Sequence, residues 1–316
     1  MNYTNCIIIK MVIDMKNKVV LIGCGNVGMA FAYALVNQKV YVDELVLIDI
    51  NTEKCYGEAM DLNHCQAYSP SRIKISVGNY SDCKDAKIVV IAAGANQSVG
   101  ETRMDLINKN SHIFKSIVSE VVESGFAGVF VVATNPLDIM TYLTLKYSGF
   151  EKNKVIGSGT TLDTARLRFL LSEKTGVCPK NIEAYVIGEH GDSEFIPWSN
   201  VNIAYKKLSD ILSLDDLKKI ENEVRESAYE IIKRKGATAY GIGMCLVKIT
   251  NAIIEDKNVI LPVSSWDEQN GVCISTPAIV NRNGVKEKIF IPLTSDETSK
   301  IKRSINVIKD AIAKIE

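Results

Sequence analysis

Several residue patterns are missing from this sequence, and each absence excludes a class of protein. Lys and Arg together number 37 among 316 residues, and Asp and Glu also number 37, which leaves a formal net charge of +0. Without a basic excess that could neutralise a phosphate backbone, we expect no nucleic-acid partner. The eight cysteines form no CxxC pair and no metal-ligand spacing, so we expect reduced thiols, no bound metal and a cytoplasmic protein.

Long apolar runs are missing too. The apolar patch at the N-terminus is interrupted by Lys10 and Asp14, and no small-residue cleavage site follows it. We therefore expect neither a secretory signal nor a membrane-spanning segment. Because the first convincing strand begins just after Met15, we interpret residues 1–15 as an N-terminal extension and expect translation to start at Met11 or Met15. The intact mass of the natively expressed protein tests this.

The apolar runs that are present alternate with amphipathic stretches through the first half of the chain. They are short, rich in β-branched residues and apolar on both faces, and they lie at 19–22, 45–48, 73–77, 88–93, 129–133 and 155–156. Alternation of this kind predicts βαβ units, and two-sided apolarity predicts a parallel sheet that helices cover on both faces. The expected fold class is α/β, with a Rossmann-type doubly wound parallel sheet over residues 16–157.

The second half has a different pattern, with longer and more charged helices and with strands in which apolar and polar residues alternate more clearly. Alternating strands are expected at 259–266, 272–280 and 287–291, and we predict an α+β substrate-binding and catalytic domain over residues 158–316. Two helices carry apolar stripes that we interpret as core-facing surfaces. The stripes consist of Leu217, Ile220, Val224, Ala228 and Ile231, and of Ile301, Ile305, Ile308, Ile312 and Ile315. The boundary near residue 157 is expected within one compact unit.

A glycine-rich turn follows the first predicted strand. Residues 23–28 form a GxGxxG motif in which Gly23 permits a tight turn, Gly25 lets a pyrophosphate approach the backbone and Gly28 lets a helix pack on the strand. The next predicted strand ends in Asp49, whose carboxylate suits a ribose diol and repels a 2′-phosphate. The motif alone is weak, but this context favours a dinucleotide site for NAD rather than NADP.

Four other segments carry unusual polar residues. Two of them, 94–103 and 134–138, directly follow predicted strands, where open α/β sheets bind ligands. The other two are 162–168, which opens a predicted helix, and 188–192, which follows an apolar run over 184–187 where we expect a strand. Each segment has a bland explanation on its own, since Asp163 and Arg166 could form a surface pair and a lone histidine is more often structural.

Together these segments resemble the L-lactate/malate dehydrogenase family, from about Lys16 to the C-terminal helix. The motifs GxGxxG, GANQxxGETR, TNPLD, LDTARLR and GEHGDSE occur in the family's order and spacing, and the sequence looks most like the bacterial L-lactate dehydrogenases. The resemblance implies reversible hydride transfer between NADH and pyruvate in glycolysis and fermentation. It also implies a homo-oligomer, usually a tetramer.

The resemblance implies a role for each polar residue. His190 would be the general acid and base, and Asp163 would orient its imidazole and stabilise the cationic form. Arg166 would hold the substrate carboxylate with its bidentate guanidinium. Arg103 would polarise the reacting carbonyl from a mobile loop that closes over the site, bracketed by Gly94 and Gly100. The two other histidines, His64 and His112, lie in helical stretches and are interpreted as structural.

The resemblance also implies a set of cofactor contacts. Asn135 would bind the substrate or the nicotinamide. The remaining cofactor-binding residues would be Gly23, Gly25, Val27, Gly28, Asp49, Lys54, Tyr80, Gly94, Ala95, Ser116, Thr134 and Ser158.

Substrate choice depends on the residue that meets the far end of the 2-oxo acid. Malate dehydrogenases of the family place an arginine where this chain has Gln97, and a neutral amide cannot compensate a buried second carboxylate. Gln97 together with Thr238, which the resemblance places beside the substrate methyl, favours pyruvate. Malate or a branched-chain 2-hydroxy acid stays open as an alternative, because apolar pockets discriminate by only about 1–3 kcal/mol per methylene.

Regulation is the one point at which the chain departs from its resemblance. In bacterial L-lactate dehydrogenases an arginine at Arg168 joins a histidine to bind fructose 1,6-bisphosphate, but that histidine position is Glu183 here. A carboxylate repels phosphate, so we expect weak activation or none, with Glu183 free to pair with Arg168 instead.

Two alternatives from other classes fit less well. A non-catalytic NAD-binding protein would be expected to have lost one of the four catalytic residues, and all four are present. An NAD-using glycosidase would need a Cys/His metal site.

Overall fold

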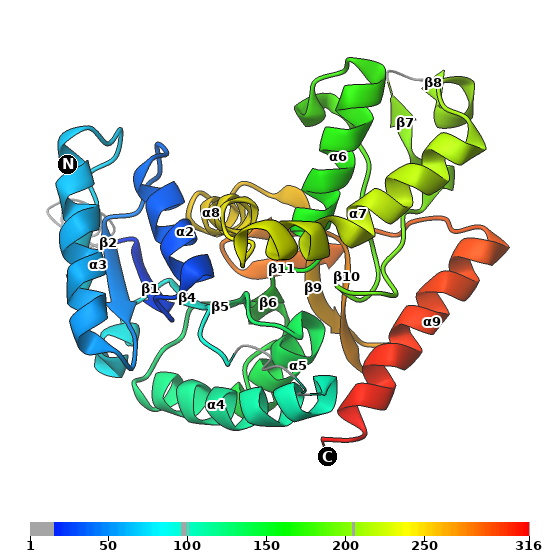
Figure 1. Ribbon diagram of the computed structural model, residues 1–316. Coiled ribbons are helices and arrows are strands. Elements are labelled where there is room, and N and C mark those ends of the chain that lie inside the picture. Colours follow the sequence, from blue (N-terminus) through cyan, green and yellow to red (C-terminus); the bar gives the residue numbers. More distant parts are fainter. Residues whose placement is uncertain (1–15, 96–99, 101, 204–205, 316) are drawn as a thin grey trace, which may run out of the picture.

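The computed structural model describes residues 16–95, 100, 102–203 and 206–315 (Figure 1). The described elements of the first half are β1 (Lys18–Ile22), α2 (Asn26–Val36), β2 (Glu44–Ile48), α3 (Thr52–His64), β3 (Lys74–Val77), β4 (Ile88–Ile91), α4 (Arg103–Glu123), β5 (Val129–Val132), α5 (Leu137–Ser148) and β6 (Val155–Gly157). Those of the second half are α6 (Thr161–Thr175), β7 (Asn202–Ile203), β8 (Lys206–Lys207), α7 (Leu214–Lys235), α8 (Tyr240–Ile254), β9 (Val259–Asp267), β10 (Val272–Asn281), β11 (Gly284–Lys288) and α9 (Ser295–Ile312). The N-terminal extension expected over residues 1–15 lies outside the described residues.

Six parallel strands form the predicted doubly wound sheet, in the order β6-β5-β4-β1-β2-β3. The order in which the chain adds strands to the sheet reverses between β1 and β4, so the loops after these two parallel strands diverge and leave a crevice at their carboxyl ends. This crevice is where the polar segments of the sequence were expected to meet. The expected fold class is confirmed.

The sheet continues into the second half of the chain. Strand β9 pairs antiparallel with β6 through Gly157 and Ser264, and β10 and β11 extend the sheet beyond it. A β-carbon on Gly157 would overlap the side chain of Thr141, so only glycine lets the two strands and α5 meet here. The two halves therefore share one continuous sheet of nine strands among the described residues.

Helices cover both faces of the sheet, each with its own apolar core. Helices α2, α3 and α8 bury one face, with Phe31, Leu35 and Leu246 against the strands (Figure 1). Helices α4, α5 and α9 bury the other, where Phe114 and Ile308 are almost fully enclosed. The C-terminal stripe of α9 packs as predicted, with three of its isoleucines buried and two partly buried.

Three local expectations were wrong. The last strand begins three residues earlier than predicted, because β10 and β11 are joined by a tight turn and pair from Asn281 and Gly284 onward. The run at 184–187 makes only isolated bridges, through Glu183 and Ile187, rather than a strand. The stripe of α7 buries Ile220 and Val224, but at its C-terminal end Ile231 is exposed.

Two further features bear on the sequence expectations. No described helix is both long enough and apolar enough to cross a membrane. The seven described cysteines form no disulfide, although the sulfur atoms of Cys24 and Cys55 lie 3.4 Å apart in the core. Burial is the main reason that both thiol pKa values lie above their usual range.

Candidate active site

The glycine-rich turn connects β1 to α2 and has the geometry of an anion site. Gly23 has φ +104°, and a β-carbon there would collide with the backbone of Ala92 and Ala93. A β-carbon at Gly28 would overlap the Gly23 carbonyl oxygen, whereas one at Gly25 would meet only open space. No side chain caps the N-terminus of α2, so its first N–H groups are available to a phosphate.

Asp49 closes this turn from the end of β2. Its Oδ2 accepts a hydrogen bond of 2.7 Å from the backbone N–H of Cys24, and Lys54 Nζ donates to the Cys24 carbonyl at 2.8 Å. A cavity of about 760 Å³ opens beside the turn, with Gly25, Asn26 and Lys54 among its lining residues. The turn, the open face of Gly25 and the carboxylate at the strand end fit a dinucleotide.

A second cavity, of about 510 Å³, lies beyond the carboxyl ends of β4 and β5. We call it the catalytic cavity. Eight of the predicted catalytic, substrate-binding and cofactor-binding residues line it: Val27, Gly94, Ala95, Thr134, Asn135, Asp163, Arg166 and His190. The structure therefore brings together residues that lie as much as 163 positions apart, from 27 to 190.

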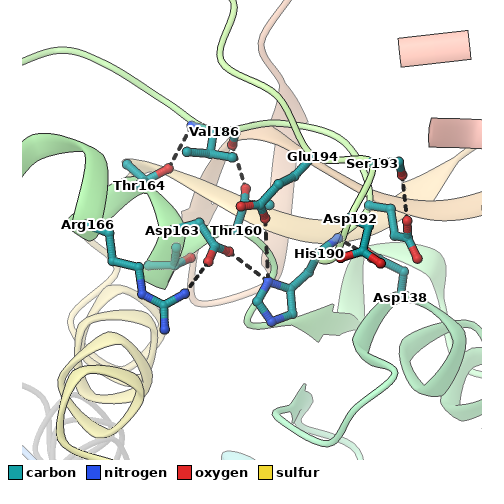
Figure 2. A network of polar contacts seen from close by, with 12 residues as sticks. Asp138, Thr160, Asp163, Thr164, Arg166, Val186, His190, Asp192, Ser193 and Glu194 are labelled. Carbon is teal, nitrogen blue, oxygen red and sulfur yellow. Dashed lines mark hydrogen bonds and ion pairs between the residues drawn. The ribbon is translucent and has the colours of Figure 1, made fainter. Parts of the chain in front are cut away.

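The histidine of this cavity is held by two acids from two different helices. Asp163, in the first turn of α6, accepts a hydrogen bond of 2.7 Å from His190 Nδ1 through its Oδ2 (Figure 2). Its other oxygen accepts one of 2.7 Å from the guanidinium of Arg166. Asp138, on α5, accepts the backbone N–H of His190 at 2.7 Å and the hydroxyl of Ser264 at 2.6 Å. Since Nδ1 is engaged, Nε2 is the ring nitrogen left for a ligand.

The electrostatics of this cluster favour a charged imidazole. Burial on its own lowers the pKa of His190, but the adjacent charge of Asp163 and the hydrogen bond to it outweigh burial and raise that pKa to about 9. Burial likewise opposes ionisation of Asp163, yet His190 and Arg166 hold the pKa of its carboxyl below the usual value. Burial raises the pKa of Asp138 to about 6.

The loop that carries His190 is also fixed from behind. Ser304, on α9, is fully buried, and its hydroxyl accepts the backbone N–H of Glu189 at 2.6 Å. The same hydroxyl lies 3.0 Å from that of Ser193, which donates to Glu189 Oε2 at 2.5 Å. A β-carbon on Gly188 would press against Ser304, so helix and loop are in close contact.

Asn110 joins the two strand-end loops that carry cofactor candidates. It is fully buried on α4, its Oδ1 accepts the N–H of Ala95 at 2.8 Å, and its Nδ2 donates to the carbonyl of Asn135 at 3.0 Å. Thr134 is anchored separately, by a hydrogen bond of 2.7 Å from its hydroxyl to the Ala93 carbonyl.

Helix α7 forms the outer wall of the catalytic cavity. Arg225, Ala228, Tyr229 and Ile232 line it, so of the predicted α7 stripe Ala228 faces this cavity. Tyr229 also donates a hydrogen bond of 3.1 Å to Asp192 beside the catalytic loop. The guanidinium of Arg225 lies 3.4 Å from Glu221, and its buried Nε has no hydrogen-bond partner.

Other predicted residues lie away from the catalytic cavity or outside the described part of the chain. Gln97 and the Arg103 side chain are not described; the backbone of Arg103 begins α4. Thr238 is partly buried in the turn between α7 and α8 and is not among the residues that line the cavity. Three predicted cofactor contacts are likewise not among the residues that line the cavity: Tyr80 is partly buried, Ser116 is exposed and Ser158 is buried.

The residues expected at a regulatory site do not contact each other in the described ion pairs. Arg168 donates from Nε to the Ala184 carbonyl at 3.1 Å, and its guanidinium lies over the ring of Tyr185. Glu183 is exposed. The other two histidines lie on helices, His64 at the end of α3 and His112 on α4, and both are exposed.

Reasoning from the sequence did not single out several residues that shape the site. Asp138 and Glu194 stand inside the recognised motifs TNPLD and GEHGDSE, so a motif position was the available signal. Asn110, Ser304 and the cavity-facing side chains of α7 lie in ordinary amphipathic helices, where nothing in the sequence distinguishes them.

Comparison with known proteins agrees with this geometry. Residues 17–157 match the family described as lactate/malate dehydrogenase, NAD binding domain, and residues 160–316 match its alpha/beta C-terminal domain. The L-lactate dehydrogenase of Borrelia hermsii is 51% identical over 312 residues, covering 95% of this chain and 99% of the relative. That of Bacillus velezensis is 52% identical over 307 residues, covering 94% and 96%.

Solved structures agree as well. A lactate dehydrogenase from a Medee basin deep-sea metagenome library has a TM-score of 0.93 and 46% identity, and covers 95% of this chain and 99% of its own. The minor L-lactate dehydrogenase of Enterococcus mundtii, in a ligand-bound form, has a TM-score of 0.93 and 41% identity, with coverage of 96% and 99%. The chain belongs to the lactate/malate dehydrogenase family, and its cofactor is NAD.

Proposed function

We propose that this protein is an L-lactate dehydrogenase that interconverts pyruvate and L-lactate. The observation that carries the proposal is the meeting of His190, Asp163 and Arg166 in one cavity with the loops at the carboxyl ends of β4 and β5. NAD, when bound, supplies the hydride acceptor, and NADH the donor. The relatives of about 50% identity are L-lactate dehydrogenases along nearly their whole length.

The protein's own part in the reaction is to hold the substrate and to move one proton. His190 keeps one hydrogen on Nδ1, bound to Asp163, and exchanges the other at Nε2 with the oxygen of the substrate. In pyruvate reduction Nε2 gives up a proton, and in lactate oxidation it receives one. The raised pKa of His190 favours the protonated form needed for reduction.

Arg166 suits the carboxylate that every 2-oxo acid carries. One of its nitrogens is bound to Asp163, which fixes the orientation of the planar group while the residue lines the catalytic cavity. We propose that Gln97, from the loop before α4, and Arg103, at the start of α4, complete the site, Arg103 at the reacting carbonyl and Gln97 at the far end of the substrate. We propose that Thr238 flanks the same end.

We propose the remaining predicted cofactor contacts on two grounds. The turn residues Gly23, Gly25 and Gly28, together with Asp49, are supported by the anion-site geometry at α2. Lys54, Tyr80, Ser116 and Ser158 rest on the family resemblance alone, since they lie outside its five motifs. The division into an NAD-binding part at 16–157 and a catalytic part at 158–316 is proposed on the same grounds.

Malate dehydrogenation is the second candidate, and one observation favours it. Arg225 lines the catalytic cavity, and its partly unpartnered guanidinium is a cation that could meet a second carboxylate. Against this, Glu221 lies close enough to balance its charge. Apolar neighbours on the same wall, Ala228 and Ile232, favour a substrate with a methyl end.

NADH oxidation with pyruvate, oxaloacetate and 2-oxoisocaproate, measured side by side, decides between these substrates. We expect kcat/KM for pyruvate to exceed that for oxaloacetate by more than about 100-fold, since an unpaired buried carboxylate costs several kcal/mol, and to exceed that for 2-oxoisocaproate by a smaller factor. Preference for oxaloacetate that disappears in Arg225→Gln would establish the malate alternative. Preference for 2-oxoisocaproate would establish the branched-chain one.

We also propose a homotetramer in the cytoplasm with little or no activation by fructose 1,6-bisphosphate. Large apolar side chains exposed on α2, α3 and α8, among them Tyr33, Met60 and Met244, support association. Arg168 is already engaged by the Ala184 carbonyl and the Tyr185 ring, which supports a weak response to the sugar phosphate. Light scattering tests the tetramer by measuring the mass of the assembly, and cell fractionation tests the location. The pyruvate KM, measured with and without fructose 1,6-bisphosphate, tests the activation, and a large fall in KM on adding the sugar phosphate contradicts the expected weak response.

A further inference from the structure

Glu194 is a buried acid beside the catalytic histidine that the reaction described above does not use. It follows His190 by four residues, and its backbone N–H donates to the Gly191 carbonyl at 3.1 Å, which folds it back over the imidazole. The residue is only 6% exposed and lines the catalytic cavity. Figure 2 shows its carboxyl pointing at the same edge of the ring that faces Asp163.

Two carboxyls thus compete for one hydrogen. Oε2 of Glu194 lies 3.9 Å from His190 Nδ1, whereas Oδ2 of Asp163 lies 2.7 Å from the same atom. Nδ1 carries a single hydrogen, and the shorter contact takes it. Oxygens of both acids and a ring nitrogen all lie within 4.8 Å of one another. A metal ion could also bridge such a group, but Arg166 and His190 already engage both oxygens of Asp163.

The charges around this group do not support two ionised carboxylates. Arg166 is directed at Asp163, and His190 is the only cation within 4.0 Å of Glu194 among the described ion pairs. The other titratable or charged groups that surround the cluster are Asp138 from α5, Cys245 from α8, Arg225 from α7, and Glu189 and Asp192 from the catalytic loop. Like charges at contact distance in a buried site cannot both ionise at ordinary pH.

We propose that Glu194 is a further positioning residue for the reaction: a carboxylic acid that keeps its proton, faces Asp163 and His190, and so limits the negative charge at Nδ1 to one. Burial and the charge of Asp163 raise the pKa of Glu194 well above its usual value, in agreement with the geometry.

A single charge at this position matters because the proton must move both ways. One carboxylate stabilises the imidazolium enough for it to form, while two would hold the proton too tightly for Nε2 to release it. A neutral Glu194 also occupies the Nδ1 edge of the ring together with Asp163, which leaves Nε2 for the substrate. The inference rests on the proposed function for its catalytic meaning, but the protonation of Glu194 can be measured without turnover.

Infrared difference spectroscopy tests the protonation directly. We expect the purified wild-type protein at pH 8 to show a carboxylic-acid C=O band that is absent from Glu194→Gln and retained in Glu173→Gln, an exposed control on α6. At this pH Asp138, with a pKa of about 6, contributes little to the band. If Glu194→Gln removes no such band, Glu194 is ionised and the proposal fails, whether or not the enzyme reduces pyruvate.

The pH profile of kcat/KM for pyruvate reduction tests the positioning role. We expect Glu194→Ala to lower kcat about tenfold and Glu194→Gln, which keeps the shape of the protonated acid, to recover most of that loss. The apparent pKa of the profile should stay within about 0.3 of wild type in Glu194→Gln, because no charge is removed. A fall of the apparent pKa by about one pH unit or more in Glu194→Gln overturns the proposal, and so do equal kcat values for Glu194→Ala and Glu194→Gln. A wild type that reduces no 2-oxo acid refutes the proposed function and leaves the infrared result standing.

Discussion

Removing the charge of Asp163 should move the working pH range of the enzyme. The raised pKa of His190, about 9 against an ordinary 6.5, depends on this carboxylate, since burial alone would lower it. In Asp163→Asn the carboxyl of Glu194 loses its charged neighbour and becomes free to ionise 3.9 Å from the ring. The double substitution Asp163→Asn with Glu194→Gln removes both acids and leaves burial as the main influence.

The magnitude follows from the two pKa values. The difference between 6.5 and about 9 corresponds to roughly 3 kcal/mol of stabilisation of the imidazolium. Reduction uses protonated His190, so in wild type it is supported below pH 9 and fails as the pH rises through about 9. In the double variant the transition should fall to about 6.5 or lower. Reduction at pH 8 is then expected to fall roughly 30-fold through protonation alone, and at pH 6 less than about twofold.

Single-turnover oxidation of NADH, followed from pH 5.5 to 10 with saturating pyruvate, is the suitable assay. A primary isotope effect with deuterated NADH verifies that hydride transfer limits the observed rate. Asp163→Asn alone should give a transition between those of the wild type and the double variant. Glu173→Gln, on the same helix and exposed, is the matched control and should keep the wild-type transition.

The reasoning fails if the double variant loses activity by the same factor at every pH. Such a result would mean that Asp163 acts by holding the imidazole or Arg166 in place and that its charge contributes little. Equal transitions in Asp163→Asn and the double variant would show that Glu194 does not take up the charge.

Three further predictions concern the cofactor turn and the support behind the histidine. Gly28→Ala should raise the Kd for NADH at least tenfold, measured by fluorescence titration, because the added methyl group overlaps the turn. Gly57→Ala on α3, where the added methyl group meets open space, is the control: it should leave the Kd unchanged and stabilise the protein by about 0.5–1 kcal/mol. Asp49→Ser should narrow the preference for NADH over NADPH in kcat/KM, because no carboxylate remains to repel the 2′-phosphate; an unchanged ratio contradicts this role. Ser304→Ala should lower kcat about tenfold with little change in KM, by loss of the hydrogen bond to the catalytic loop. Ser299→Ala, on the exposed side of the same helix, is its control, and equal effects of the two would show that the loop does not depend on α9.

The sequence predicted the parallel sheet well because its signal is local. Each of the six strands is a short β-branched run bounded by helical stretches, and the structure places all six where those runs lie. The continuation of the sheet into the second half depends instead on one pair, Gly157 with Ser264. No local sequence pattern predicts the pairing of residues 107 positions apart. The sequence therefore predicted two halves with different secondary structure and did not predict that they share one sheet.

Helix α7 shows how an apolar stripe can mislead. Its spacing is that of a core-facing helix, and Ile220 and Val224 do lie in the core. Farther along, the stripe leaves the core: Ala228 lines the catalytic cavity and Ile231 is exposed. A cavity wall and a core both favour apolar residues at helical spacing, so periodicity cannot separate them.

The catalytic cluster was predictable in part for a similar reason. His190, Asp163 and Arg166 stand in motifs at strand ends and helix starts, and topology brings such positions together. Glu194 and Asn110 act through contacts that only the folded chain creates, at a distance of a few ångströms from partners on other elements. Their roles are therefore properties of the packing.

The buried polar cluster also links activity to stability. Asp163 is the one carboxylate that contacts both Arg166 and protonated His190, so truncating it leaves two buried cations uncompensated, and breaking a buried pair in this way costs about 3–5 kcal/mol. Such a cluster adds little net stability, because desolvation offsets the attraction between its members. Its value is orientation: Asp163 and Glu194 both face Nδ1 of the imidazole, and Asp138 holds the backbone N–H of His190. The same desolvation that makes the cluster expensive gives His190 its raised sensitivity to a single neighbouring charge, which is what a residue that must both bind and release a proton requires.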